Sequence, residues 1–146
     1  MFTETVNVTG RLKIAHFDES GKEKDFREVK NLVVAVGKDV ITSRLAGNTT
    51  AIPSHMAVGS SNTAATTAQT ALGTELGRVT LDSSVRTNNT IAYIATFPAG
   101  TGTGAITEAA ILNASSTGDM LCRTNFNAVN KAAGDVIVIT WNVTIS

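Results

Sequence analysis

Strict alternation near the end of the chain constrains the fold more than any other feature of the sequence. Side chains of an extended strand point alternately to its two faces. Between residues 137 and 145, this places five large apolar residues on one face and leaves the other face more polar. The first face holds Ile137, Ile139, Trp141, Val143 and Ile145, and the second holds Val138, Thr140, Asn142 and Thr144. A long, half-buried strand is predicted, with Trp141 as a structural residue of the core.

Weaker versions of this alternation recur along the chain. Apolar residues at alternate positions between residues 6 and 14 predict a first strand, and residues 26–34 predict its returning partner. Together these two strands would form a charged N-terminal hairpin within residues 1–35. Further short strands are predicted at residues 55–59, 76–81, 90–97 and 120–126. Residues 82–89 are rich in turn formers and are interpreted as a connection.

One segment, Lys38 to Ala46, predicts a helix. Its apolar residues fall on one face, Asp39 lies in the first turn, and Gly47 can end the helix in a left-handed conformation. A helix of about nine residues is too short to be stable alone, so it must cover an end or an edge of the sheet. About eight strands without strand–helix alternation predict an all-β fold. We expect an antiparallel β-sandwich, jelly-roll-like, in a single domain spanning residues 1–146.

Charged residues are concentrated at the beginning of the chain. Fifteen of the 24 lie in the first 44 residues, and the densest mixed run spans residues 22–28. This run is interpreted as a solvated hairpin tip or, alternatively, as a docking surface. By contrast, residues 48–75 form a long loop or arm rich in Ser, Thr, Ala and Asn. Long loops of this kind are typical of interaction surfaces, and the low charge favours a surface that a partner covers.

The overall composition excludes several kinds of partner. Lys and Arg balance Asp and Glu at 12 each, which argues against nucleic acid and against an acidic membrane surface. Apolar runs are too short for a membrane-spanning helix, and the first residues do not resemble a secretion signal. The lone Cys122 cannot form an intramolecular disulfide. We therefore expect a soluble protein made in a reducing cytoplasm.

A glycine-rich stretch after the strand at residues 90–97 allows two interpretations. Gly100, Gly102 and Gly104 could cradle a phosphate or could form the turn between two strands. A dinucleotide fingerprint needs its third glycine one residue later, and a Walker-type loop needs a lysine after its last glycine. Neither requirement is met. The three glycines are therefore predicted to be structural turn residues, and no cofactor is expected.

Glu108 is the one acid that lies inside an apolar run, Ile106 to Leu112. One hypothesis makes it half of a catalytic carboxylate pair. The favoured hypothesis makes it a structural residue, bonded to backbone amides or to an arginine such as Arg78 or Arg123. Arg78 and Glu108 are accordingly predicted to hold the fold together.

No other residue pattern indicates catalysis or metal binding. His16 and His55 each lack a neighbouring acid or cysteine at ligand spacing. Cys122 and Arg123 would point to opposite faces of a strand, and no Gly-X-Ser-X-Gly sequence is present. We predict that the protein is not an enzyme and binds no metal.

A set of motifs over about residues 30–146 resembles small virion proteins of tailed bacteriophages. Single motifs are weak, but the group is specific. They are Asn31-Leu32-Val33-Val34, Gly37-Lys38-Asp39-Val40-Ile41, Ser54-His55-Met56-Ala57-Val58-Gly59, Ala71-Leu72-Gly73-Thr74-Glu75-Leu76-Gly77-Arg78, Phe97-Pro98-Ala99-Gly100-Thr101-Gly102, Ile106-Thr107-Glu108-Ala109-Ala110-Ile111-Leu112-Asn113, Asn130-Lys131 and Ile139-Thr140-Trp141. In that family the segment after the glycine-rich turn is a strand; here Ala110 and Leu112 stand where it often has Gly and Phe.

The resemblance implies a phage structural protein without catalytic activity. Size and strand count favour a capsid decoration (cement) protein, located on the outer surface of the virion and made in the host cytoplasm. A tail, baseplate or fibre component is the alternative. The implied partners are the major capsid protein and further copies of the chain, as a dimer or trimer. Predicted contacts come from the hairpin tip and the long arm: Asp18, Lys22, Lys24, Asp25, Asn62, Thr66, Thr67 and Gln69.

Overall fold

Nine strands and one helix build the chain in a computed structural model that describes residues 3–146. Every pair of neighbouring strands is antiparallel. The elements are β1 (Val8–Phe17), β2 (Glu23–Val33), α1 (Ala35–Leu45), β3 (His55–Gly59), β4 (Glu75–Thr80), β5 (Ser83–Thr87), β6 (Thr90–Phe97), β7 (Gly104–Leu112), β8 (Met120–Lys131) and β9 (Val136–Ile145).

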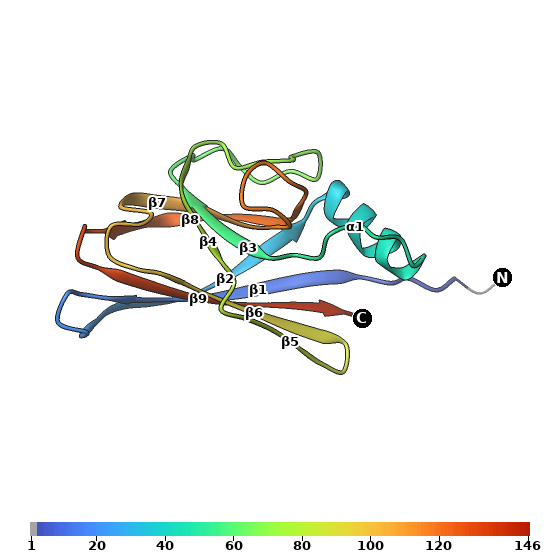
Figure 1. The fold of residues 1–146 in the computed structure, drawn as a ribbon, viewed down its shortest axis with the longest axis horizontal. Helices are drawn as coiled ribbons and strands as arrows, with labels where there is room; N and C mark the ends of the chain where they lie inside the picture. The colour runs from blue at the N-terminus through green and yellow to red at the C-terminus, as the bar shows by residue number, and fades with distance from the viewer. Residues whose placement is uncertain (1–2) are drawn as a thin grey trace.

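The strands form one sheet in the order β4-β3-β7-β8-β2-β1-β9-β6-β5, which curls into two facing layers (Figure 1). Strand β2 belongs to both layers, because it pairs with β1 along most of its length and with β8 only at Leu32 and Val33. The predicted all-β, antiparallel class is confirmed. The strand number is nine, one more than expected, and this continuous order does not establish a jelly roll.

The strand predicted from strict alternation is β9, which lies near the middle of the lower layer between β1 and β6. Its inward side chains, including Trp141, are buried in the main hydrophobic core. Leu12 of β1 and Tyr93 of β6 lie directly opposite Trp141 on the two neighbouring strands. The alternation of apolar and polar residues is clearest in this central strand, because both of its edges are hydrogen-bonded to neighbouring strands and one of its faces is buried.

Helix α1 begins at Ala35, three residues earlier than predicted, and ends at Leu45. It packs against β8, at the end of the molecule from which the N-terminal segment leaves (Figure 1). The contact is close at Gly37, where a β-carbon would overlap the backbone carbonyl of Leu121. Gly47 has a φ of 79°, as predicted for the residue that ends the helix.

The prediction of a connection at residues 82–89 is wrong in part, since Ser83–Thr87 forms strand β5. It pairs with β6 through a tight turn at Asn88, which has a φ of 54°. Strand β5 is the outermost strand of its layer, and most of its side chains are exposed. An exposed edge strand has no buried face to impose an apolar alternation, so the sequence pattern could not reveal it.

Residues 48–75 were predicted as a long loop or arm with a short strand at residues 55–59, and that strand is present as β3. The irregular part that remains after β3 runs from Ser60 to Thr74 and is called the arm below. Residues 67–72 contain turns and bends and no helix. Among the described residues, no helix is long and apolar enough to cross a membrane.

Candidate functional site

The arm rises from β3 and returns to β4, passing over the outer side of β7 and β8 (Figure 1). It lacks regular secondary structure, so its backbone groups need partners other than a strand ladder. No Asp, Glu, Lys or Arg occurs between Arg44 and Glu75. The arm is therefore an uncharged surface whose shape depends on polar contacts from the layer beneath it.

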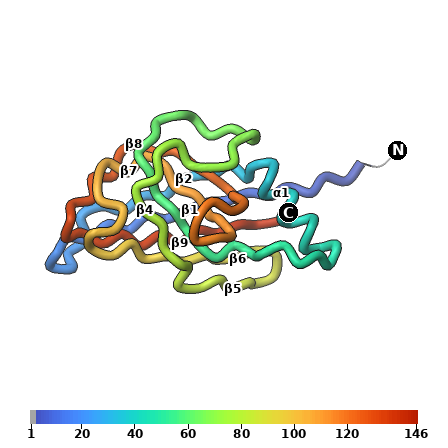
Figure 2. The backbone as a smooth tube through the Cα atoms, turned by 45° about the horizontal axis from the view of Figure 1, so that its top comes forward, coloured from blue at the N-terminus to red at the C-terminus, as the bar shows by residue number. Residues whose placement is uncertain are grey.

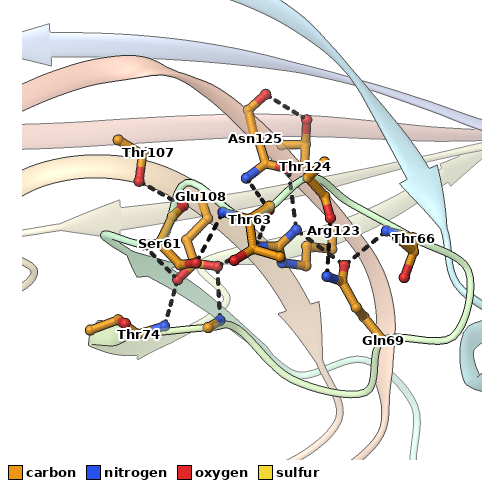
Figure 3. A network of polar contacts seen from close by, with 12 residues as sticks. Ser61, Thr63, Thr66, Gln69, Thr74, Thr107, Glu108, Arg123, Thr124 and Asn125 are labelled. Atoms are coloured by element: carbon orange, nitrogen blue, oxygen red, sulfur yellow. Dashed lines mark hydrogen bonds and ion pairs between the residues drawn. The ribbon is translucent and has the colours of Figure 1, made fainter.

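Glu108 of β7 supplies the first set of these contacts (Figure 3). Its carboxylate is fully buried and accepts three backbone N–H groups of the arm. The donors are Gly73 at 2.9 Å, Thr74 at 2.8 Å and Ser61 at 3.2 Å. One carboxylate thus holds both the beginning and the end of the arm.

Arg123 of β8 lies beside Glu108, with 2.7 Å between Nη2 and Oε2. The same guanidinium also reaches the middle of the arm. Nη2 donates to the carbonyl of Thr63 at 3.0 Å, and Nη1 donates to Oε1 of Gln69 at 3.1 Å. Only 1% of the Arg123 side chain is exposed. The pair is therefore a buried ion pair whose remaining hydrogen-bonding positions are used mainly to fasten the arm.

These contacts determine the charge state of Glu108. Burial raises the pKa of its carboxyl, but the amides of Thr74 and Gly73, the Arg123 guanidinium and the amide of Ser61 lower it. The second group of effects is larger, so the pKa lies below the usual value and the group is ionised at neutral pH. The structural hypothesis for Glu108 is consistent with this geometry, and Arg123 is the arginine involved.

Arg78, the other arginine considered for Glu108, binds elsewhere. It pairs with Glu75 at 2.6 Å and donates to the carbonyls of Ala114 and Thr117, each at 2.9 Å. It thereby links β4 to the loop between β7 and β8. These contacts are consistent with the structural role predicted for Arg78, but they hold the loop between β7 and β8 and not the arm.

Two glycines, Gly59 and Gly73, allow the arm to approach Glu108. A β-carbon on Gly59 would overlap both the Glu108 carboxylate and the carbonyl of Thr74. A β-carbon on Gly73 would lie 2.4 Å from Oγ of Ser61. Glycine at position 59 leaves room for the carboxylate, and glycine at position 73 leaves room for Ser61, so both ends of the arm can close around Glu108. In the sequence, the position of these glycines at the two ends of a Ser/Thr-rich loop is the feature that could have identified them.

Of the four residues of the arm that were predicted to contact a partner, three are exposed and one is already hydrogen-bonded within the chain. Asn62, Thr66 and Thr67 are exposed. Gln69 is half-buried, and its side-chain amide is already used within the chain: Oε1 accepts from the Thr66 amide at 2.9 Å, and Nε2 donates to the Ala64 carbonyl at 3.1 Å. Gln69 therefore shapes the arm, while the other three are free to meet a partner.

The hairpin tip shows a similar division. Asp18 closes the turn by accepting from Ser20 and from the amide of Lys22, and these hydrogen bonds lower the pKa of its carboxyl. Lys24 pairs with Asp135 at 2.9 Å, and Asp25 pairs with Arg27 at 2.7 Å. Only Lys22 among the four predicted contact residues projects its charge without a partner in the described structure.

Asp135 is a buried acid that no sequence pattern singled out. It accepts from Nε2 of His16 at 2.8 Å, from Lys24 and from the backbone amide of Ala132 at 2.9 Å. Three hydrogen bonds hold the pKa of Asp135 far below its usual range; the bond from Lys24 has the largest effect, followed by those from the Ala132 amide and His16. Burial acts in the opposite direction and is outweighed. The cluster ties the hairpin to the β8–β9 turn. No short-range spacing indicates it, because His16 and Asp135 are 119 residues apart.

The hairpin tip and the arm do not form one surface. The tip projects at one end of the long axis, whereas the arm lies across the upper layer (Figures 1 and 2). The two sets of predicted contact residues therefore remain separate.

The glycine-rich stretch lies between β6 and β7 and carries the chain from one layer to the other. Gly100, Gly102 and Gly104 all have positive φ, at 83°, 69° and 134°. The amide of Gly100 donates to the Ala133 carbonyl at 2.8 Å, and β7 continues as a strand. The geometry is that of a turn between strands, as predicted, and lacks the helix that a phosphate-binding loop requires.

The other residues considered for catalysis or metal binding do not form a common site. Cys122 is buried, and burial raises its pKa well above the usual value, which favours the thiol. The imidazole of His55 forms hydrogen bonds with the hydroxyls of Ser54 and Thr80. Within residues 3–146, no three His, Cys, Asp or Glu side chains are grouped to hold a metal ion.

Comparison with known proteins yields no relative: no family model, no curated protein and no solved structure matches this chain.

Proposed function

We propose that this chain is a capsid decoration (cement) protein of a tailed bacteriophage. It binds the outer surface of the major capsid shell, stabilises the shell and performs no catalysis. The carrying observation is the arm, an uncharged surface held in place by a buried ion pair and four backbone contacts. A surface fastened before binding loses little conformational entropy on contact with a partner.

The chemistry of the arm suits a protein surface. Its exposed residues Asn62, Thr66 and Thr67 offer short polar side chains, which can be desolvated at lower cost than charges. Weak contacts of this kind become effective when many copies bind one shell or when copies associate as dimers or trimers. The curled two-layer sheet supports the jelly-roll-like sandwich that we propose for the protein, since its layers face each other across one core.

Two charges placed on the arm test this proposal. Asn62→Glu with Thr66→Glu changes exposed side chains and leaves the Glu108–Arg123 contacts in place. Deleting residues 62–70 is a less specific test, because it also removes the Thr63 and Gln69 partners of Arg123. A matched control places the same two charges at Thr9 and Thr87, which are exposed on strands of the other layer.

The measurement is occupancy on purified capsids that lack the protein, scored by quantitative gel after incubation and sedimentation. We expect the arm variant to lose occupancy and the control to bind like the wild type. Normal occupancy of the arm variant would refute the assignment of the arm. Failure of the wild-type protein to bind any capsid surface would refute the decoration function itself.

A tail, baseplate or fibre component is the second candidate. The observation that favours it is the N-terminal segment Thr3–Asn7, which extends away from the body like an attachment segment (Figure 1). Copy number per virion separates the two functions, because a decoration protein scales with the capsid surface and a tail component does not. A count of only a few copies would replace the decoration function by this alternative.

A further inference from the structure

An apolar groove of about 520 Å³ lies between helix α1 and the layer that contains β5, β6 and β9. Val40 and Ile41 of the helix form one wall, and Ile91, Tyr93 and Val143 form the other, with Leu121 between them. Its volume falls within the range of ligand-sized cavities. The groove is distinct from the arm and the hairpin tip and has no role in the contacts described above.

Apolar surface continues from the groove onto its rim. Three rim residues expose large fractions of their apolar side chains: 83% of Leu45, 57% of Ile52 and 37% of Ile145. Single exposed apolar residues are ordinary, but several around one apolar groove indicate a surface that another chain covers.

The rim also carries unbalanced positive charge. Arg44 and Arg86 line the groove, and no carboxylate does. Arg44 donates to the carbonyls of Asn48 and Thr50, and Arg86 donates to that of Asn88. Neither forms an ion pair among the described residues. The occupant that fits is an extended segment that presents an apolar side chain to the groove and an acid to the two arginines.

The N-terminal segment Thr3–Asn7 contains one apolar residue, Val6, and one acid, Glu4. Val6 exposes 72% of its side chain, and Glu4 is exposed without an ion pair in the described structure. Two residues apart, the two side chains share one face of an extended chain. The segment leaves the sheet at Asn7, which exchanges both backbone hydrogen bonds with Ser146. Ser146 follows Ile145, so the segment departs from the rim of the groove itself.

The direction of the segment favours a second copy over its own chain as the acceptor. Beyond Asn7 it runs outward, away from both layers and past α1 (Figures 1 and 2). To enter its own groove, the segment would have to reverse direction at once. Its one turn-forming residue, Asn7, is already paired with Ser146 through both of its backbone hydrogen bonds. Because the segment and the groove lie side by side in each copy, two copies related by a two-fold axis can each place their segment in the groove of the other.

We propose that two copies of this chain exchange their N-terminal segments, each placing Val6 in the partner's apolar groove and Glu4 beside Arg44 and Arg86. The exchange covers apolar surface at both groove rims and places one carboxylate beside the two arginines of each groove. It deepens the proposed function, which uses several copies of the chain. Its test needs only the isolated protein, so capsid binding and self-association can fail separately.

Charge exchange tests the ionic contact. Sedimentation equilibrium of the full chain should show a dimer. Glu4→Arg alone and the pair Arg44→Glu with Arg86→Glu should each raise the dissociation constant at least about tenfold, as loss of a close charge pair does. Combining all three changes restores the opposite charges and should recover most of the affinity. A monomeric wild type, or no recovery in the combination, would overturn the proposal.

Disulfide trapping tests the position of the segment. One variant carries Val6→Cys and the other carries Ile52→Cys; the native Cys122 is buried and does not compete. Mixing them under mild oxidation should give a covalent heterodimer whose cross-linked peptide joins positions 6 and 52. Each variant oxidised alone serves as the control for random collision. Heterodimer yield no greater than in these controls, or an intrachain bond in the doubly substituted chain without interchain product, would overturn the exchange.

Discussion

The arm and the N-terminal hairpin are each fastened to the body by one buried carboxylate, but in different ways. Glu108 accepts three backbone amides of the arm and pairs with an arginine that is itself buried. Asp135 accepts one backbone amide and two side chains, and Lys24, its cationic partner, remains 41% exposed.

The difference follows from the secondary structure that each carboxylate supports. The hairpin is a regular ladder along β1 and β2, so its backbone is already satisfied and Asp135 only fixes its position. The arm has no ladder, and the buried pair supplies part of its backbone hydrogen bonding. Removing the acid should therefore cost much more in the arm than in the hairpin.

Glu108→Ala should give the largest effect. It leaves the Arg123 guanidinium buried without a counter-charge and frees three backbone amides. We expect a loss of about 3–5 kcal/mol in the free energy of unfolding, measured by urea denaturation. A loss below about 1 kcal/mol would show that the Glu108–Arg123 pair does not stabilise the arm.

A double variant, Glu108→Leu with Arg123→Met, separates the two roles of the pair. Apolar replacement removes the unpaired charge and should recover much of the stability lost in Glu108→Ala. The arm should still be released, because its backbone partners are gone. Limited proteolysis with thermolysin measures this release; trypsin cannot, since residues 45–77 contain no Lys or Arg. If the arm of the double variant resists thermolysin as well as that of the wild type, the buried pair does not hold the arm in place.

Acid should weaken both attachments together. The pKa values of Glu108 and Asp135 lie below their usual values in the folded chain, so the unfolded chain binds more protons as the pH falls below about 4. The free energy of unfolding should therefore be constant near neutral pH and decrease below about pH 4. Urea midpoints at pH 7, 4 and 3 measure this decrease, which should be shallower in the double variant that lacks Glu108.

Asp135→Asn should destabilise the protein less than Glu108→Ala. The exposed ammonium of Lys24 can return to water when its partner is neutralised, whereas the Arg123 guanidinium cannot. Asparagine also keeps an oxygen that can accept the Ala132 amide. Urea denaturation of both variants under identical conditions gives the comparison, and an equal or larger loss in Asp135→Asn would reverse it.

Thr107→Val should have the smallest effect. The Thr107 hydroxyl donates to the Ser61 carbonyl at 2.9 Å and is one of several contacts that hold this end of the arm. Replacing it with an isosteric apolar side chain should cost about 1 kcal/mol. Proteolysis near Ser61 should rise while resistance near Thr74 is retained. Release of the whole arm would show that its two ends are not held independently.

Much of the architecture followed from local pattern. The period-two alternation of β9, β1 and β6 identified these strands because each has one dry face. The left-handed conformation of Gly47 and a turn at Gly100, Gly102 and Gly104 were predicted from the residues around them. The exposed edge strand β5 was missed because neither of its faces imposes a pattern.

The sequence by itself determined an all-β chain, the position of its apolar faces and the isolation of Glu108 within one of them. Only the tertiary structure decided that Arg123, 15 residues away, is its partner, that Asp135 meets His16, and that a groove opens beside Ile145. Alternation is a property of each strand and can be read locally. Partners and grooves depend on how distant strands are ordered in the sheet, which no short window of residues contains.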